Sequence, residues 1–118
     1  MGKLLDLFSP HRDNGLRADG TPKGMGYFGA LDLSGGGIAT EYSEGITLDG
    51  HSIEIPTLVP SLTPQELYEM INEVIPNNRP APEHIFKKAL AHAKSRISKG
   101  MSPFATEEDS LINIWNEE

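Results

Sequence analysis

Asp49 and Gly50 divide residues 37–59 into two runs in which apolar and polar side chains alternate. Asp-Gly is typical of a type I′ turn, because both central positions of that turn need a positive φ. A two-residue loop also fixes the register of the two strands, and it places Leu48 opposite His51. The sequence therefore predicts a β-hairpin, and this prediction constrains the rest of the fold more than any other stretch.

The predicted register divides the hairpin into two faces, because side chains alternate along a strand. One face is expected to pack on the core and holds Ile38, Thr40, Tyr42, Glu44, Ile46, Leu48, His51, Ile53, Ile55, Thr57 and Val59. The other is expected to face solvent and holds Glu41, Ser43, Gly45, Thr47, Ser52, Glu54 and Pro56. Glu44 is a carboxylate on the apolar face, so it either reaches water at the rim or faces a partner protein. Because Pro56 has no N–H to donate, its strand is expected to be an edge, which leaves a homo-oligomer open through edge pairing.

The chain before the hairpin is rich in glycine and has no helical or strand period over residues 11–26. Residues 1–26 are therefore predicted to form an extended arm. Its apolar cluster includes Leu4, Leu5 and Phe8, which either anchor the arm on a partner or form a frayed end. Residues 27–33, with the interface candidate Phe28, are predicted to add a third strand and complete an antiparallel meander.

Two helices are predicted after the hairpin. Thr63 is the expected N-cap of the first, with Pro64 at its first position and Glu66 closing a capping box. Its apolar stripe, at helical spacing, consists of Leu67, Met70, Ile71, Val74 and Ile75. The second helix is expected to run from residue 82 or 83 to residue 99, with Gly100 after it. Its predicted buried side consists of Ile85, Phe86, Ala89, Leu90, Ala93 and Ile97.

The second helix also has five basic residues, Lys87, Lys88, Lys94, Arg96 and Lys99. They either form a solvated face that matches the helix dipole or contact an acidic partner. Beyond it, Phe104 is expected to pack back on the core. Residues 106–118 are predicted to form an acidic, amphipathic tail with a short helix capped by Thr106. Three apolar residues at helical spacing, Leu111, Ile114 and Trp115, form its candidate interface.

The composition indicates one domain, over residues 27–105, in a chain of 118 residues with a formal net charge of −7. That charge argues against general nucleic-acid binding. No apolar run approaches the roughly 20 residues that a membrane span needs. The chain has no cysteine, and its four histidines lack the spacing of a metal site. Because no catalytic, cofactor or metal motif occurs, we expect a binding protein of the α+β class and not an enzyme.

Five segments occur in the order ADGTPKGMGYFG (residues 18–29), TEYS (40–43), IEIPTLVP (53–60), KALAHA (88–93) and GMSPFA (100–105). This ordered set resembles a small family that recurs in tailed bacteriophages and prophages, as stand-alone proteins and as segments of larger virion-associated ones. The resemblance covers about residues 17–105 and transfers no catalytic residue. It implies a minor structural or accessory protein of the phage particle.

The expected partners are therefore other virion proteins, contacted through the two arms and the exposed sheet edge. The expected location is the phage particle, or the host cytoplasm during assembly. An accessory protein that binds and inhibits a host enzyme is an alternative, which the acidic composition suits. A cell-wall-degrading enzyme or its helper is a second alternative, and it would need a carboxylate cluster among Glu41, Glu44 and Glu54.

Overall fold

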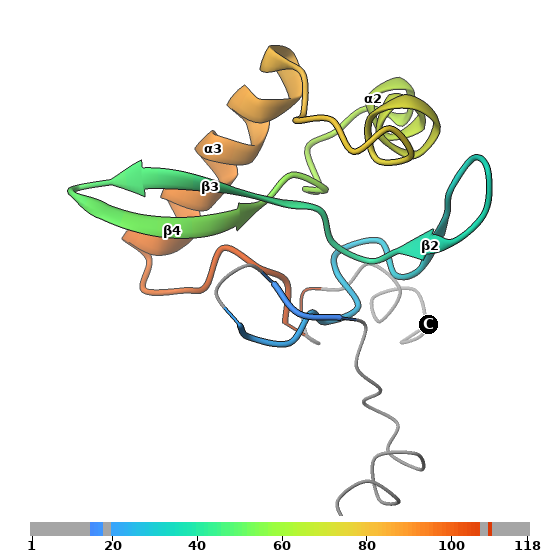
Figure 1. Cartoon of the computed structure of the whole chain (residues 1–118). Coiled ribbons are helices and arrows are strands. Elements are labelled where there is room, and N and C mark those ends of the chain that lie inside the picture. The colour runs from blue at the N-terminus through green and yellow to red at the C-terminus, as the bar shows by residue number, and fades with distance from the viewer. Residues whose placement is uncertain (1–14, 18–19, 107–108, 110–118) are drawn as a thin grey trace, which may run out of the picture.

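The structure is a computed structural model that describes residues 15–17, 20–106 and 109. Its order of elements is β1 (Leu31–Asp32), β2 (Ile38–Ala39), β3 (Ser43–Leu48), β4 (His51–Pro56), α2 (Pro64–Glu69), the π-helical turn η1 (Met70–Val74) and α3 (Glu83–Ser98). The fold belongs to the α+β class, as expected, with α3 lying across the β3–β4 sheet (Figure 1).

The hairpin of β3 and β4 confirms the predicted register. Leu48 lies opposite His51, and the ladder continues to Ser43 opposite Pro56. Both turn residues have a positive φ, 51° for Asp49 and 81° for Gly50, as a type I′ turn requires. The sequence around this turn is therefore sufficient to set the pairing.

The predicted meander is wrong. Within the described part of the chain, β1 pairs only with β2, so the molecule has two separate two-stranded sheets. The strand period is interrupted in the link between the sheets, where the adjacent residues Thr40 and Glu41 are both buried. Ile38, which was expected in the core, is 59% exposed, whereas Glu41, which was expected in solvent, is 3% exposed. A bend between two sheets changes which side chains face inward, and period-two counting does not anticipate it.

Both predicted helices are confirmed in position. Thr63 and Glu66 form the reciprocal capping box. The Glu66 N–H donates to the Thr63 hydroxyl at 3.1 Å, and the Thr63 N–H donates to the Glu66 carboxylate at 2.9 Å. The helix then widens into η1, where the Ile75 N–H donates to the Met70 carbonyl, five residues back. At the end of α3, Gly100 has the positive φ expected after a helix.

The core lies between α3, β4 and the residues that follow β4. Its fully buried or nearly buried members are Ile55, Leu58, Val59, Leu62, Met70, Val74, Ile85, Ala89 and Ala93. Phe104 is buried, as predicted, and Phe28 packs on the core while half-buried. Pro56 is also buried and not on a solvent face. Ile97 is a further correction: it is exposed, because it lies in the last turn of α3, beyond the sheet.

Candidate functional site

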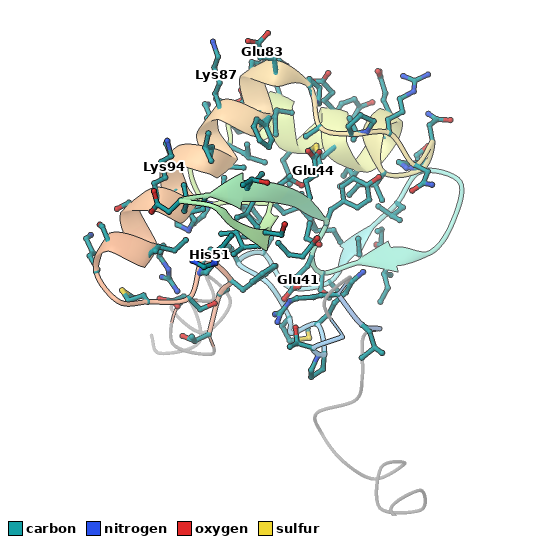
Figure 2. All side chains as sticks on the ribbon, turned by 60° about the vertical axis from the view of Figure 1, so that its left-hand side comes forward. Glu41, Glu44, His51, Glu83, Lys87 and Lys94 are labelled. Carbon is teal, nitrogen blue, oxygen red and sulfur yellow. The ribbon has the colours of Figure 1, made fainter. Side chains whose placement is uncertain are left out.

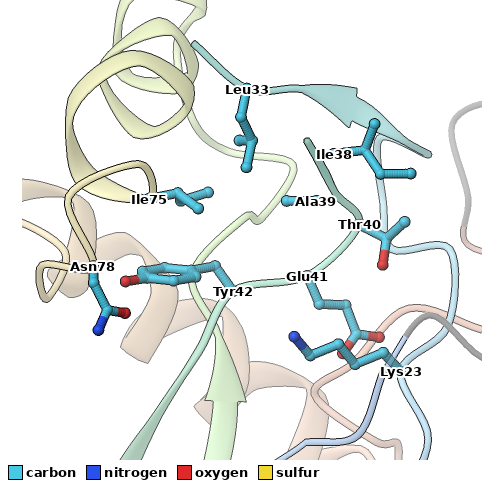
Figure 3. Close-up of a pocket in the computed structure, with 9 residues that line it drawn as sticks. All are labelled: Lys23, Leu33, Ile38, Ala39, Thr40, Glu41, Tyr42, Ile75 and Asn78. Atoms are coloured by element: carbon cyan, nitrogen blue, oxygen red, sulfur yellow. The ribbon is translucent and has the colours of Figure 1, made fainter. Parts of the chain in front are cut away.

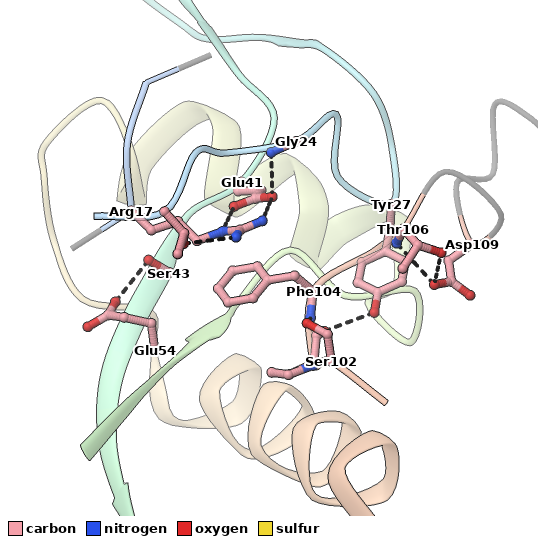
Figure 4. A network of polar contacts seen from close by, with 12 residues as sticks. Arg17, Gly24, Tyr27, Glu41, Ser43, Glu54, Ser102, Phe104, Thr106 and Asp109 are labelled. Atoms are coloured by element: carbon pink, nitrogen blue, oxygen red, sulfur yellow. Dashed lines mark hydrogen bonds and ion pairs between the residues drawn. The ribbon is translucent and has the colours of Figure 1, made fainter. Parts of the chain in front are cut away.

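The arm reaches the domain at Glu41, whose side chain is 2% exposed. The Arg17 guanidinium donates two hydrogen bonds of 2.8 Å to this carboxylate, from Nε to Oε1 and from Nη2 to Oε2. The backbone N–H of Gly24 donates to the same Oε2 at 2.9 Å (Figure 4). A buried charge is tolerated when it is paired and fully hydrogen-bonded, and here three donors satisfy Glu41. We call the contacts of Arg17, Gly24 and Glu41 the arm junction.

Two further contacts hold the arm in place. The Arg17 guanidinium carbon lies 3.9 Å from the centre of the Phe104 ring, in a cation–π contact. Gly26 passes so close to the strand link that a Cβ on it would lie 2.0 Å from the Thr40 carbonyl oxygen. Only glycine fits this position, because its φ of 75° also disfavours a side chain.

Tyr27, which follows the arm, connects it to α3 and to the chain that follows α3. Its hydroxyl lies 2.9 Å from the Pro103 carbonyl oxygen and 2.7 Å from His92 Nε2. A carbonyl only accepts, so the Tyr27 hydroxyl donates to Pro103, and His92 Nε2–H must donate to the Tyr27 oxygen. Burial raises the pKa of Tyr27 to about 12. Burial, reinforced by the nearby Arg96 charge, lowers the pKa of His92. Both groups are therefore neutral near pH 7, and this arrangement is typical of a structural contact.

Arg96 fixes the chain that follows α3. It donates to the carbonyls of Ser102 and Phe104, at 2.8 and 3.1 Å, and to Asp109 Oδ2 at 2.8 Å. The hydrogen bond from Arg96 holds the pKa of the Asp109 carboxyl well below its usual range. Thr106 donates to the same carboxylate from its N–H and its hydroxyl. Arg96 is thus an internal clamp and not part of a solvated basic face.

The remaining basic residues of α3 divide into two groups. Lys87 and Lys94 project away from the body (Figure 2), and Lys87 pairs with the exposed Glu83, at 3.5 Å. Lys88 instead reaches the α2 cap and binds Glu66 Oε1 at 2.6 Å. That bond, with the capping bond from Thr63, lowers the pKa of Glu66 to about 2. The basic bias of α3 is therefore partly solvated and partly used within the fold.

The three glutamates considered for catalysis each have a partner within the molecule. Glu41 binds Arg17, Glu44 accepts a hydrogen bond from the backbone N–H of Ala81, and Glu54 accepts one from the Ser43 hydroxyl at 3.0 Å. Glu44 lies between the hairpin and the helical side (Figure 2), where it fixes the loop that leads into α3. Among the described residues, no group of three or more acidic or histidine side chains is arranged to hold a metal ion.

A cavity of about 450 Å³ lies between the β1–β2 hairpin and the chain that follows η1 (Figure 3). Five of its nine lining residues are apolar or aromatic, namely Leu33, Ile38, Ala39, Tyr42 and Ile75. Its polar lining includes Lys23, Thr40, Glu41 and Asn78. Two hydrogen bonds fix the walls: the Ser34 N–H donates to the Ile71 carbonyl at 3.0 Å, and the Tyr42 hydroxyl donates to the Arg79 carbonyl at 2.9 Å. We call this cavity the β1–β2 pocket.

The charges around the β1–β2 pocket do not balance. Glu41 is neutralised by Arg17, whereas the Lys23 ammonium forms no ion pair with any residue that the structure describes. The Thr40 hydroxyl is buried and has no hydrogen-bond partner within the same part of the chain. Apolar side chains beside a cation that has no ion pair in the described part of the chain suit an apolar group next to a negative charge.

Most of the sequence-predicted interface residues lie outside the described residues, namely Leu4, Leu5, Phe8, Leu111, Ile114 and Trp115. Sequence reasoning missed Arg17, Tyr27, His92 and Arg96, which the structure brings together around the arm. The one available signal was the closely spaced pair Gly24 and Gly26, since glycine allows a close approach of backbone to a strand.

No helix of the described residues has both the length and the apolar character that a membrane span needs. No protein-family model, curated protein or solved structure matches the chain.

Proposed function

We propose that this protein is a minor structural or accessory component of a tailed-phage particle and binds a neighbouring particle protein along the outer edge of β3. The observation that supports the proposal is that edge. Among the residues that the structure describes, the sheet of β3 and β4 has two strands, so each strand offers one unpaired side. An unpaired strand edge is a template for a strand from another chain.

The register identifies which backbone groups point outward. The type I′ turn makes Leu48 and His51 a hydrogen-bonded pair, and every second pair along the ladder is then hydrogen-bonded. The bond of 2.8 Å from the Thr57 N–H to the Tyr42 carbonyl continues this alternation beyond the strands. By the same alternation, the outward N–H and C=O groups on β3 belong to residues 43, 45 and 47.

The β3 edge is better suited to a partner strand than the β4 edge. Gly45 and Thr47 are exposed on β3. On β4, Pro56 occupies an outward position and has no N–H to offer. In addition, α3 packs against β4 (Figure 1). A partner strand is therefore expected to pair with β3.

The phage context of the proposal rests on the resemblance of the five segments. They contribute, in order, Gly24 and Tyr27, Glu41 and Ser43, Glu54, His92, and Ser102 and Phe104. Most of these residues lie in the polar network of Figure 4. The segments therefore build the scaffold that holds the arm and the hairpin. Of the outward positions on β3, the segments include residue 43 and not residues 45 and 47.

A short strand edge alone gives a weak contact, so a second one is needed for stable attachment. The apolar residues Leu111, Ile114 and Trp115 are the proposed second contact, because two linked contacts reinforce each other through a high effective concentration. All three lie outside the described residues. Because Glu41, Glu44 and Glu54 all have internal partners, we propose binding and not wall degradation.

The proposal is tested with a pair of proline variants at positions that face each other across the hairpin. Thr47 lies opposite Ser52, and both point their N–H groups outward, Thr47 on β3 and Ser52 on β4. Proline at either position removes an outward donor without removing a ladder bond. We expect Thr47→Pro to lower the copy number of the protein in purified particles at least several-fold. Ser52→Pro is expected to leave the copy number unchanged.

Copy number is measured by quantitative mass spectrometry of particles. Urea unfolding of both variants checks that they are equally folded. Equal incorporation of the two folded variants would contradict the role of β3. Absence of the wild-type protein from particles would contradict the virion assignment, and stoichiometric retrieval of one host enzyme from uninfected lysate would then favour an inhibitor.

A further inference from the structure

The β1–β2 pocket has the chemistry of a site for one segment of this same chain. We propose that residues 4–8, Leu-Leu-Asp-Leu-Phe, bind in the β1–β2 pocket of their own molecule, with Asp6 facing Lys23. The segment lies outside the described residues, and the proposal does not depend on the proposed phage function. Under this proposal, the apolar cluster at the start of the arm fills a pocket of its own molecule.

The first argument is chemical complementarity. The pocket combines five apolar or aromatic side chains with one cation, Lys23, that has no ion pair in the described part of the chain. Residues 4–8 offer four large apolar side chains around a single carboxylate, Asp6. At about 450 Å³, the pocket has the volume of an ordinary ligand site and can hold large apolar side chains. Ile38, a wall residue that is 59% exposed, would gain cover from them.

The second argument is the place where the described chain begins. The Gly15 carbonyl accepts a hydrogen bond of 2.9 Å from the Lys23 N–H, so the arm enters the described structure beside the cation of the pocket. Phe8 is seven residues before Gly15, and seven extended residues span up to about 25 Å. The pocket is therefore within reach of residues 4–8 of the same molecule.

The third argument is effective concentration. A short flexible connection gives its attached segment an effective concentration of about 1 mM at a nearby site. A contact with a dissociation constant of about 1 mM would consequently be half occupied within one molecule, although two separate molecules would need millimolar protein. Binding within the molecule therefore needs only a modest apolar contact and one ion pair.

The chain has no cysteine, so a single introduced cysteine is a unique attachment point for a nitroxide label. We place the label at Ser9→Cys in the full-length protein and measure paramagnetic broadening of backbone amides by NMR. The amides of Leu33, Ala39 and Asn78 report on the pocket, and that of Gly50 reports on the distant hairpin turn. We expect at least a two-fold greater loss of intensity at the three pocket amides than at Gly50.

Two sets of variants separate docking from random proximity. Replacing Leu5, Leu7 and Phe8 by serine together keeps the chain length and is expected to abolish the selective broadening. Lys23→Glu is expected to lower the docking equilibrium constant about two- to five-fold, the range for one partly exposed ion pair. Adding Asp6→Lys to Lys23→Glu is expected to restore it. Lys23 is not one of the three residues that make the contacts of the arm junction, so the fold is expected to persist in the Lys23 variants. Urea unfolding checks that the triple serine variant is folded.

Three results would overturn the proposal. One is broadening that is uniform, or that survives in the triple serine variant. The second is selective broadening from a label at Asn116→Cys and not from Ser9→Cys, which would make the C-terminal tail the occupant. The third is broadening in a mixture of unlabelled ¹⁵N protein and labelled ¹⁴N protein, which would place the segment of one molecule in the pocket of another.

Discussion

The two hairpins of this protein differ in what fixes them. The β3–β4 hairpin has strands of six residues and a two-residue turn whose residues, Asp49 and Gly50, both have a positive φ. The β1–β2 hairpin has strands of only two residues and a longer loop with three glycines, at 35, 36 and 37, all of positive φ. The first has enough local pairing to define its own register, and the second does not.

The β1–β2 hairpin is instead placed by contacts with distant parts of the chain. The Ser34 N–H donates to the Ile71 carbonyl of η1. At the other end, the strand link at Thr40 and Glu41 is held by Gly26 and Arg17 of the arm. The comparison shows that a long hairpin can set its own register, whereas a hairpin with two-residue strands depends on the surfaces packed around it.

The largest expected effect tests the contact between the arm and the strand link. Gly26→Ala forces a Cβ against the Thr40 carbonyl oxygen at a positive φ. We expect a loss of about 3 kcal/mol or more in the free energy of unfolding, measured with urea. Gly35→Ala is the matched control, with a φ of 87° and no atom of the described residues within 4 Å of the new Cβ. It is expected to cost about 1 kcal/mol, and equal losses would show that the close approach at Gly26 contributes nothing.

The second-largest effect is expected at Glu41, in the strand link between the two sheets. Glu41→Gln keeps the shape of the side chain but leaves Arg17 without its charged partner in a mostly buried place. We expect a loss of about 2–3 kcal/mol. Hydrogen exchange is expected to speed up at the Gly24 amide, a donor to Glu41, and to stay slow at the Ile46 amide in β3. Glu54→Gln, at a half-buried hydrogen bond, is the control and should lower the free energy of unfolding far less. Faster exchange at the Ile46 amide in Glu41→Gln would mean that the two hairpins unfold together.

A smaller effect tests the local turn of β3–β4. Gly50→Ala places a side chain at a φ of 81° in open space, so only backbone strain opposes it. We expect a loss of about 1 kcal/mol by urea unfolding. Gly50→Asn is expected to cost about half as much, since asparagine tolerates this conformation better. If Ala and Asn are equally tolerated at position 50, the type I′ geometry does not set the stability of this hairpin.

The smallest effect is a pH dependence that arises from His92 in α3 and Glu66 in α2 and not from the β3–β4 hairpin. Burial lowers the pKa of His92 in the folded state, so the unfolded chain binds a proton more readily. Stability is therefore full above the unfolded pKa of about 6.5 and falls as the pH drops below it, with less than one proton taken up on unfolding. A second loss follows below about pH 4.5, as Glu66, whose pKa is about 2 in the fold, becomes protonated on unfolding.

Urea unfolding at several pH values measures both losses. His92→Gln keeps a donor for the Tyr27 oxygen and cannot titrate, so it should remove the fall near pH 6.5. His92→Gln should leave the loss of stability below about pH 4.5 unchanged. A fall near pH 6.5 that persists in His92→Gln would assign it to another histidine.

The helices show how far sequence reasoning extends. Thr63 and Glu66 lie three residues apart and cap each other, which is a local geometry, so the start of α2 was predictable. The widening into η1 was not predicted, because the apolar spacing of Met70 and Val74 suits either helical type. The candidate site was harder still. Arg17 and Glu41 are 24 residues apart, and neither stands in a pattern that names the other.

The sequence by itself determined the β3–β4 register, both helices and the general α+β class, because turns, caps and apolar stripes act between residues that are close along the chain. Only the tertiary structure decided that Glu41 is buried and paired with Arg17, that Arg96 holds the connector, and that the strand expected at residues 27–33 is a separate short hairpin. These features depend on which surfaces meet after the chain has folded, and a buried charge is stable only once its distant partner has arrived.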